Sequence, residues 1–197
     1  MPPPIRDLAL LSDCQSAALV TRDGTVAWWP APRFDSPSAF SALLDDDAGH
    51  WSVRPAGRFE AERRYLQGTL VLETTMRCSS GTLRLTDALA LAPGARGHDI
   101  GHEVPCALVR VAEGIAGEVD VELDCVPRLE YGLVVPRLVE IEDAAATVGG
   151  PERILLAEEV DAATGEPLGN TPQAIAHIGL VNAAAALTEA EERQVAA

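Results

Sequence analysis

Short apolar or alternating runs separated by turn residues dominate residues 15–156, and this pattern predicts β-strands. The predicted strands form three consecutive pairs: 16–20 with 25–29, 70–78 with 82–87, and 107–111 with 118–125. Asp23-Gly24 joins the first pair, and an Asp-Gly step between two such runs is a strong hairpin signal. Gly114 and Gly117 are predicted to join the third pair.

The run 118–125 alternates strictly between apolar and acidic residues. One face carries Val119, Val121, Leu123 and Cys125, and the other carries Glu118, Asp120, Glu122 and Asp124. Because successive side chains of a strand point to opposite faces, we expect the first face to meet a core and the second to meet water. Further strands are predicted at 133–141, 144–148 and 153–156, and one short helix at 38–44. About nine or ten short strands with regular turn signals predict a mainly β fold, a β-sandwich.

The pattern changes after residue 156. Residues 161–169 predict a loop, and Thr171-Pro172 offers an N-cap followed by proline at the first helical position. A helix is predicted from 172 to about 190, because apolar residues recur there at helical spacing. We therefore expect a sandwich over 5–156 and a short C-terminal loop and helix over 157–197.

Composition removes several classes of function. The net charge is −15, which argues against nucleic-acid partners, because binding there depends on neutralising phosphates. All 15 basic residues are arginine, which excludes Schiff-base chemistry and a lysine-containing phosphate loop. No apolar run approaches the roughly 20 residues of a membrane-spanning helix, and the N-terminus lacks a signal-peptide pattern, so we expect a cytoplasmic protein without a membrane partner. No cofactor is predicted.

The candidate metal ligands do not predict a metal site. Cys14, Cys78, Cys106 and Cys125 are widely spaced single residues, which predicts buried free thiols rather than disulfides or a metal site. His98 and His102 are four residues apart, but the glycines around them favour a solvated loop over a metal-binding helix.

The segment 5–156 resembles the N-terminal domain of bacterial glycoside hydrolase family 15, the glucoamylase and trehalase group. The resemblance rests on Ile5-Arg6-Asp7-Leu8-Ala9-Leu10, Asp13-Cys14, Ala17-Ala18-Leu19-Val20, Arg22-Asp23-Gly24, Pro32-Arg33-Phe34-Asp35-Ser36-Pro37, Gly49-His50-Trp51, Arg64-Tyr65, Gly68-Thr69, Thr86-Asp87, Arg110, Glu113-Gly114 and Pro127-Arg128. It implies a β-sandwich that normally accompanies a catalytic (α/α)6 barrel.

The tail resembles the last loop and helix of that barrel, through Ala157-Glu158-Glu159-Val160-Asp161, Thr164-Gly165-Glu166-Pro167-Leu168-Gly169-Asn170 and residues 172–184. The resemblance implies a joint near residues 155–157, as an internal deletion of most of the barrel would produce. Without the helices that would bury its apolar stripe, the tail helix is expected to be mobile, with Glu158 exposed.

The same resemblance implies a catalytic role for one residue. Inverting glycosidases use two carboxyl groups roughly 6.5–9.5 Å apart, one as acid and one as base. The base of the family maps onto Glu158, and no segment matches the acid. We therefore expect a truncated member of an α-glucoside hydrolase lineage, with trehalose or maltooligosaccharides as family substrates, that is inactive alone. The alternative is a binding or assembly module that docks on a separate helical barrel, self-associates or binds sugar weakly.

Two sets of residues carry open alternatives. Arg33 and Asp35, in a turn between Pro32 and Pro37, either form a local ion pair or belong to a loop that faces the barrel and shapes its mouth. Trp28, Trp29 and Trp51 are read as core or interdomain residues, with sugar stacking as the alternative.

Overall fold

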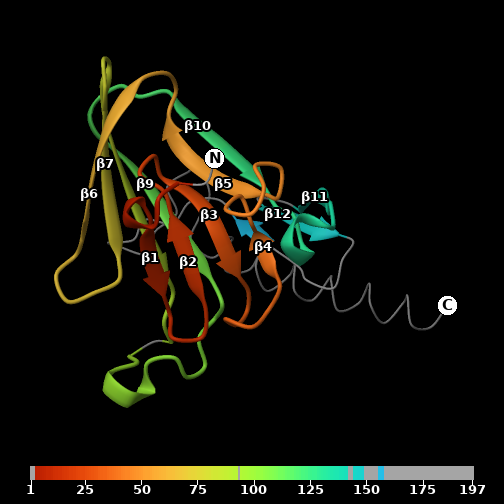
Figure 1. The fold of residues 1–197 in the computed structure, drawn as a ribbon. Coiled ribbons are helices and arrows are strands. Elements are labelled where there is room, and N and C mark those ends of the chain that lie inside the picture. Colours follow the sequence, from red (N-terminus) through yellow and green to blue (C-terminus); the bar gives the residue numbers. More distant parts are fainter. Residues whose placement is uncertain (1–2, 93, 142–143, 149–154, 158–197) are drawn as a thin grey trace. The chain divides into compact units, whose positions relative to one another are not determined.

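The computed structural model describes residues 3–92, 94–141, 144–148 and 155–157 (Figure 1). The chain divides into two compact units, Met1–Val135 and Pro136–Ala197. The predicted helix at 172–190 and Glu158 lie outside the described residues. Almost all of the predicted segment 157–197 does too, so the proposed domain boundary stays a prediction.

The first unit contains two antiparallel sheets. One sheet has the order β1-β2-β3-β5-β10, with β4 paired to β3, and the other has the order β6-β7-β8-β9. The strands of the first sheet are β1 (Ala9–Ser12), β2 (Ala17–Val20), β3 (Thr25–Pro30), β4 (Ser38–Phe40), β5 (His50–Pro55) and β10 (Val121–Val126). Those of the second are β6 (Phe59–Tyr65), β7 (Leu72–Cys78), β8 (Gly81–Leu89) and β9 (Leu108–Gly117). The predicted mainly β fold with two packed sheets is confirmed.

The remaining elements are short. Three single 3-10 turns, η1 (Ile5–Asp7), η2 (Gly97–Asp99) and η3 (Glu130–Gly132), lie in the first unit. The second unit contains an antiparallel sheet of β11 (Arg137–Ile141), β12 (Ala144–Val148) and β13 (Leu155–Ala157), which confirms the strands expected there. Within the described part of the chain, no helix is long and apolar enough to cross a membrane.

Strict alternation along β7 and β8 builds the core between the two sheets. Every second residue is buried from Leu72 to Met76 on β7 and from Leu83 to Leu89 on β8. On the facing sheet, the aromatic rings of Trp29 and Phe40 stack with their centroids 6.2 Å apart, and Trp51 packs beside Phe40. Period-two burial of this kind removes apolar area from water on one face of each sheet.

A buried ion pair ties the two sheets together at their centre. The side chains of Arg110 on β9 and Asp87 on β8 are 1% and 0% exposed, and Arg110 Nε donates to Asp87 Oδ1 at 2.9 Å. The same guanidinium donates to the backbone oxygens of Trp51 (2.6 Å) and Gly24 on the facing sheet and lies 5.1 Å from the centroid of the Trp51 ring. Burial raises the pKa of the Asp87 carboxyl, and the charge of Arg110 opposes that shift. One side chain therefore crosses the core and bonds both sheets.

A second connection closes one side of the sandwich. The hydroxyl of Tyr65 on β6 donates to the Leu10 oxygen (3.1 Å) and accepts from the Leu10 backbone N–H (2.8 Å) on β1. Arg63, also on β6, donates to the Val20 oxygen at 3.1 Å. These bonds join strands of opposite sheets, so β6 is held over β1 and β2.

The predicted helix at 38–44 is wrong. Residues 38–40 form β4, whose three side chains are all buried, and Ser41 and Leu44 lie in the turn that follows. Pairing with the C-terminal half of β3 buries Ala39 and Phe40 completely. Such tertiary burial overrides the helical start that Pro37 suggested.

The predicted pairing of 107–111 with 118–125 is also wrong. Strand β9 pairs with β8, and β10 pairs with β5 of the other sheet. Strand β9 runs on to Gly117, whose φ of +68° turns the chain, and the Ala56 N–H donates to the Asp120 oxygen at 2.7 Å, which extends the pairing of β5 with β10 within the other sheet. The expected core face of 118–125 is buried only in part: Val119 and Cys125 pack against the core, whereas Val121 and Leu123 are 44% and 67% exposed.

Removing one partner of the central ion pair should destabilise the fold strongly. We expect Asp87→Asn to lower the free energy of unfolding by about 3–5 kcal/mol, because it leaves the Arg110 charge buried and unpaired. The double variant Asp87→Leu with Arg110→Met should recover a large part of that loss, because no buried charge remains. Urea unfolding followed by far-UV circular dichroism measures both. A double variant that is less stable than Asp87→Asn would contradict the assignment.

The four free cysteines should differ in reactivity, because the thiolate is the reactive form. Burial raises the pKa of Cys125 to about 12, whereas the Ser80 hydroxyl bonded to Cys78 lowers the pKa of that thiol. We expect iodoacetamide at pH 8 to alkylate Cys78 early and Cys125 last, with Cys14 exposed and open to reagent. Peptide mass spectrometry over a time course measures the order, and the chain unfolded in urea should show no such spread.

Candidate functional site

The loop 31–37 between β3 and β4 folds on itself through its own polar groups. The Arg33 N–H donates to the Ser36 hydroxyl, and the Ser36 N–H donates to the Arg33 oxygen, each at 3.1 Å. Arg33 Nε donates to Asp35 Oδ1 at 3.0 Å, although both side chains are exposed. The local ion pair expected from the sequence is therefore present. Whether the loop also faces a barrel stays a prediction.

The ion pair limits the chemistry of Asp35. The hydrogen bond from Arg33 holds the pKa of the Asp35 carboxyl below its ordinary value. Asp35 is therefore ionised at neutral pH, whereas a general acid needs a raised pKa to keep its proton. This arrangement suits contact with a partner and does not suit protonation of a leaving group.

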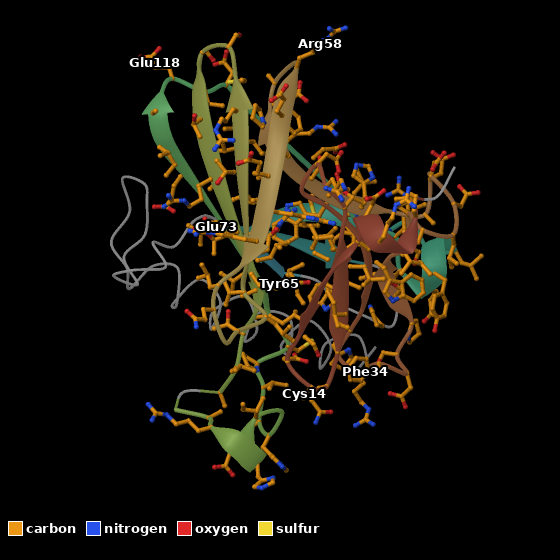
Figure 2. All side chains as sticks on the ribbon, turned by 60° about the vertical axis from the view of Figure 1, so that its left-hand side comes forward. Cys14, Phe34, Arg58, Tyr65, Glu73 and Glu118 are labelled. Carbon is orange, nitrogen blue, oxygen red and sulfur yellow. The ribbon has the colours of Figure 1, made fainter. Side chains whose placement is uncertain are left out.

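Neighbouring loops fix the position of the loop 31–37. The Phe34 N–H donates to the Gln15 oxygen at 2.7 Å, and the Gln15 side-chain amide donates to the Gly101 oxygen at 2.8 Å. Asp13 in turn accepts the backbone N–H groups of Gln15 (2.9 Å) and Ser16 (2.6 Å). Figure 2 shows Phe34 and Cys14 toward the same end of the unit, away from Arg58 and Glu118.

The turn η3 completes this end of the unit. The Tyr131 hydroxyl donates to the Ser36 oxygen at 3.4 Å, and its ring stacks on Trp28 with centroids 6.1 Å apart. Gly132 has a φ of +97°, and a Cβ there would lie 2.7 Å from Ala48 Cβ. Glycine is therefore needed for η3 to approach the turn before β5, and this approach places Tyr131 beside the loop 31–37.

Exposed apolar side chains gather around these turns. Phe34 is 58% exposed, Tyr131 43% and Leu133 85%. We call Phe34, Tyr131 and Leu133, together with Arg33 and Asp35, the loop-end surface. Exposed apolar groups on a hydrogen-bonded support are typical of association surfaces.

The predicted site residues fall in different places. Arg33 and Asp35 belong to the loop-end surface, whereas Glu158 lies outside the described residues. Trp29 is buried in the core, and Trp51 packs against that core. Trp28 is half-buried and stacks on Tyr131. His98 and His102 lie in a loop that contains η2, as expected.

Sequence reasoning missed two features. Asp87 lies at the position that continues the buried alternation of Leu83 and Leu85, so a charge at a core position could have been read from the pattern. The role of Tyr131 had no such signal, because it depends on the contacts of η3 with the turn at Ala48 and with the loop 31–37.

The chain is similar to a protein family and to several known proteins. The family model described as "Trehalase-like, N-terminal" matches residues 1–181. Trehalase of Mycolicibacterium smegmatis is 38% identical over 142 residues, which cover 66% of this chain and 21% of that protein. Trehalase of Mycobacterium tuberculosis is 36% identical over 142 residues, with coverage of 66% and 20%.

A more distant relative aligns over more of the chain. Trehalase 1 of Sulfolobus acidocaldarius is 29% identical over 170 residues, which cover 85% of this chain and 27% of that protein. The matched part of this chain thus spans about a fifth to a quarter of the length of these relatives. No solved structure matches the chain.

The two supports of the loop-end surface should differ in their effect on stability. We expect Gly132→Ala to lower the free energy of unfolding by more than about 1 kcal/mol, because alanine is strained at this positive φ and meets Ala48. Arg33→Ala should leave the unfolding midpoint nearly unchanged, because an exposed ion pair contributes little. Urea unfolding monitored by tryptophan fluorescence compares the two. A wild-type midpoint for Gly132→Ala would contradict the role given to this glycine.

Proposed function

Because this chain belongs to the trehalase-like N-terminal family, we propose that it is a non-catalytic module of a glycoside hydrolase family 15 lineage. Its function in this proposal is to dock on a helical barrel that hydrolyses α-glucosides such as trehalose or maltooligosaccharides. The single observation that carries the proposal is the loop-end surface, where large apolar side chains stand exposed on a fixed support.

The fixed support favours docking because binding then costs little ordering. The backbone of Phe34 is bonded to Gln15, and the side chain of Tyr131 is held by Ser36 and Trp28, so the loop that carries Phe34 and the ring of Tyr131 are in place before a partner arrives. Interfaces take most of their energy from a few such aromatic anchors. Preorganisation also reduces the entropy lost on association.

Inactivity of the chain alone follows from the two carboxyl groups that inversion requires. By resemblance Glu158 is the general-base equivalent, and no segment of the sequence matches the family's acid. Asp35, the carboxylate of the loop-end surface, is ionised and bonded to Arg33. Supporting this proposal, the matched part of the chain spans about a fifth to a quarter of the length of its trehalase relatives.

We further propose that 157–197 is a remnant of the C-terminal end of the (α/α)6 barrel. The model of the N-terminal family matches through residue 181, beyond the proposed joint near 155–157, and so gives no support to that joint. The remnant therefore rests on the sequence resemblance of the tail, and Glu158 is in this proposal an orphaned descendant of the base.

Complementation tests both parts of the proposal. The chain alone should release no more glucose from trehalose or maltotriose than buffer does, and Glu158→Gln should change nothing, because one carboxyl of the pair is absent. Added to the remainder of the Mycolicibacterium smegmatis trehalase, from which the matching segment has been deleted, the chain should raise trehalose hydrolysis in a saturable way. A coupled glucose assay measures both.

Variants connect the complementation to the loop-end surface. The double variant Phe34→Ala with Tyr131→Ala should raise the half-saturating concentration at least about tenfold. The control Ile5→Ala removes a still more exposed apolar side chain on η1 and should have no effect. Glucose release by the chain alone would contradict the proposed inactivity, and complementation insensitive to Phe34 and Tyr131 would contradict the docking surface.

A further inference from the structure

Strand β10 ends the larger sheet with one edge open. It pairs with β5 in an unbroken antiparallel register from Val121 opposite Pro55 to Val126 opposite His50. Among the residues that the structure describes, no strand pairs with its other edge, and Figure 1 shows β10 outside β5 at the margin of the sheet. The backbone N–H and C=O groups along that edge are available to a further strand.

The apolar side chains on the inner face of β10 extend the core past the part that the facing sheet covers. Leu123 lies opposite Val53, which is 5% exposed and packs against Met76 and Leu85 of the facing sheet. Leu123 itself is 67% exposed, and Val121 is 44% exposed opposite buried Pro55. The row of inward-facing apolar side chains therefore continues from β5 onto β10, but on β10 these side chains are exposed.

The outer face of β10 is acidic. Glu122 and Asp124 both have side chains that are 58% exposed. Asp124 Oδ2 lies 2.9 Å from His50 Nε2, and Glu122 Oε2 lies 3.9 Å from Arg54 Nε, so both partners come from the β5 side. On the side away from β5, the carboxylates of Glu122 and Asp124 are accessible to a neighbouring segment.

The edge carries charged side chains, Glu122 and Asp124, but lacks other usual devices against strand pairing. Residues 121–126 contain no lysine or proline, and their pairing with β5 contains no bulge. Natural sheets use these devices to block unwanted partners. Their absence at a strand with an uncovered apolar row leaves the edge competent to accept a strand.

A second copy of this chain is a poor occupant. Antiparallel self-pairing that keeps Val121 and Leu123 on the inner face has two registers of longest overlap, and these place Glu122 opposite Asp124 or Asp124 opposite Asp124. Like charges directly opposite one another destabilise a strand pair. The occupant must therefore carry positive charge where β10 carries Glu122 and Asp124.

We propose that the open edge of β10 binds an extended partner segment in which apolar and basic residues alternate. The segment adds a further strand to the sheet. Its apolar side chains cover Val121 and Leu123, and its arginines or lysines pair with Glu122 and Asp124. This site is separate from the loop-end surface, and the inference holds whether or not the chain docks on a barrel.

A labelled synthetic peptide tests the site on the full chain. The probe is a fluorescein-labelled octapeptide that alternates arginine with valine. Fluorescence anisotropy should show saturable binding that weakens as salt increases. Hydrogen exchange should slow at the amides of 121–126 when the peptide is bound. Peptides with glutamate in place of arginine, with the arginines and valines in two blocks, or with N-methylated valines should bind at least about tenfold more weakly.

Matched variants locate the binding. Leu123→Lys places a charge on the inner row and should weaken peptide binding at least about tenfold, as should Glu122→Gln with Asp124→Asn. Ile5→Lys, at a still more exposed apolar position on η1, should bind like the wild type. Circular dichroism and the urea midpoint report whether each variant is folded, and both acidic-face substitutions are at exposed side chains.

Several results would overturn the proposal. These are an absence of binding by the alternating peptide, equal binding of the glutamate or block peptide, or wild-type affinity in folded Leu123→Lys. Protection confined to strands other than β10 would also overturn it. Sedimentation that shows a dimer of the free chain, abolished by Leu123→Lys, would assign the edge to a second copy and reject the basic partner.

Discussion

The guanidinium of Arg110 is the contact on which the arrangement of the two sheets depends. It leaves β9, pairs with Asp87 on β8, and reaches the backbone oxygens of Trp51 and Gly24 on the opposite sheet. A buried charge is costly unless it is paired and its donors are satisfied. Here the carboxylate, two carbonyl oxygens and the Trp51 ring surround it. Because the Gly24 turn and β5 are held by the same group, any sliding of one sheet over the other breaks several charge-assisted bonds at once.

The other connections between the sheets are unevenly distributed, and this explains where the exposed surfaces lie. Tyr65 and Arg63 hold β6 over β1 and β2, so that side of the sandwich is closed by hydrogen bonds. No comparable bond among the described residues reaches from the second sheet to Val121 or Leu123 on β10. The two sheets are thus hydrogen-bonded to each other at one edge and at the centre, whereas Val121 and Leu123 at the other edge are exposed. Apolar area left exposed at such an edge favours association.

The sequence predicted those parts of the fold that depend on local signals. The hairpin at Asp23-Gly24 and the pair 70–78 with 82–87 are correct because a turn joins strands that pair directly. The helix at 38–44 failed because pairing with β3 buries that segment, and the pairing of β9 with β10 failed because β10 pairs with β5, which is distant in sequence. The loop at Arg33 and Asp35 was found from its residues. The partners that hold the loop, Gln15 and Tyr131, are far away in sequence and could not be inferred from it.

The chain path between β10 and η3 determines whether the open edge and the loop-end surface influence each other. The Arg128 N–H donates to the Ala39 oxygen at 3.0 Å, and Leu129 is completely buried just before η3. Coupling between two sites requires an element with two arrangements that both sites bias. This connecting segment is bonded to β4 at Arg128 and buried in the core at Leu129, and both contacts oppose a second arrangement. We therefore expect a strand added to β10 to leave Tyr131 where Ser36 and Trp28 hold it, and the two surfaces to act additively.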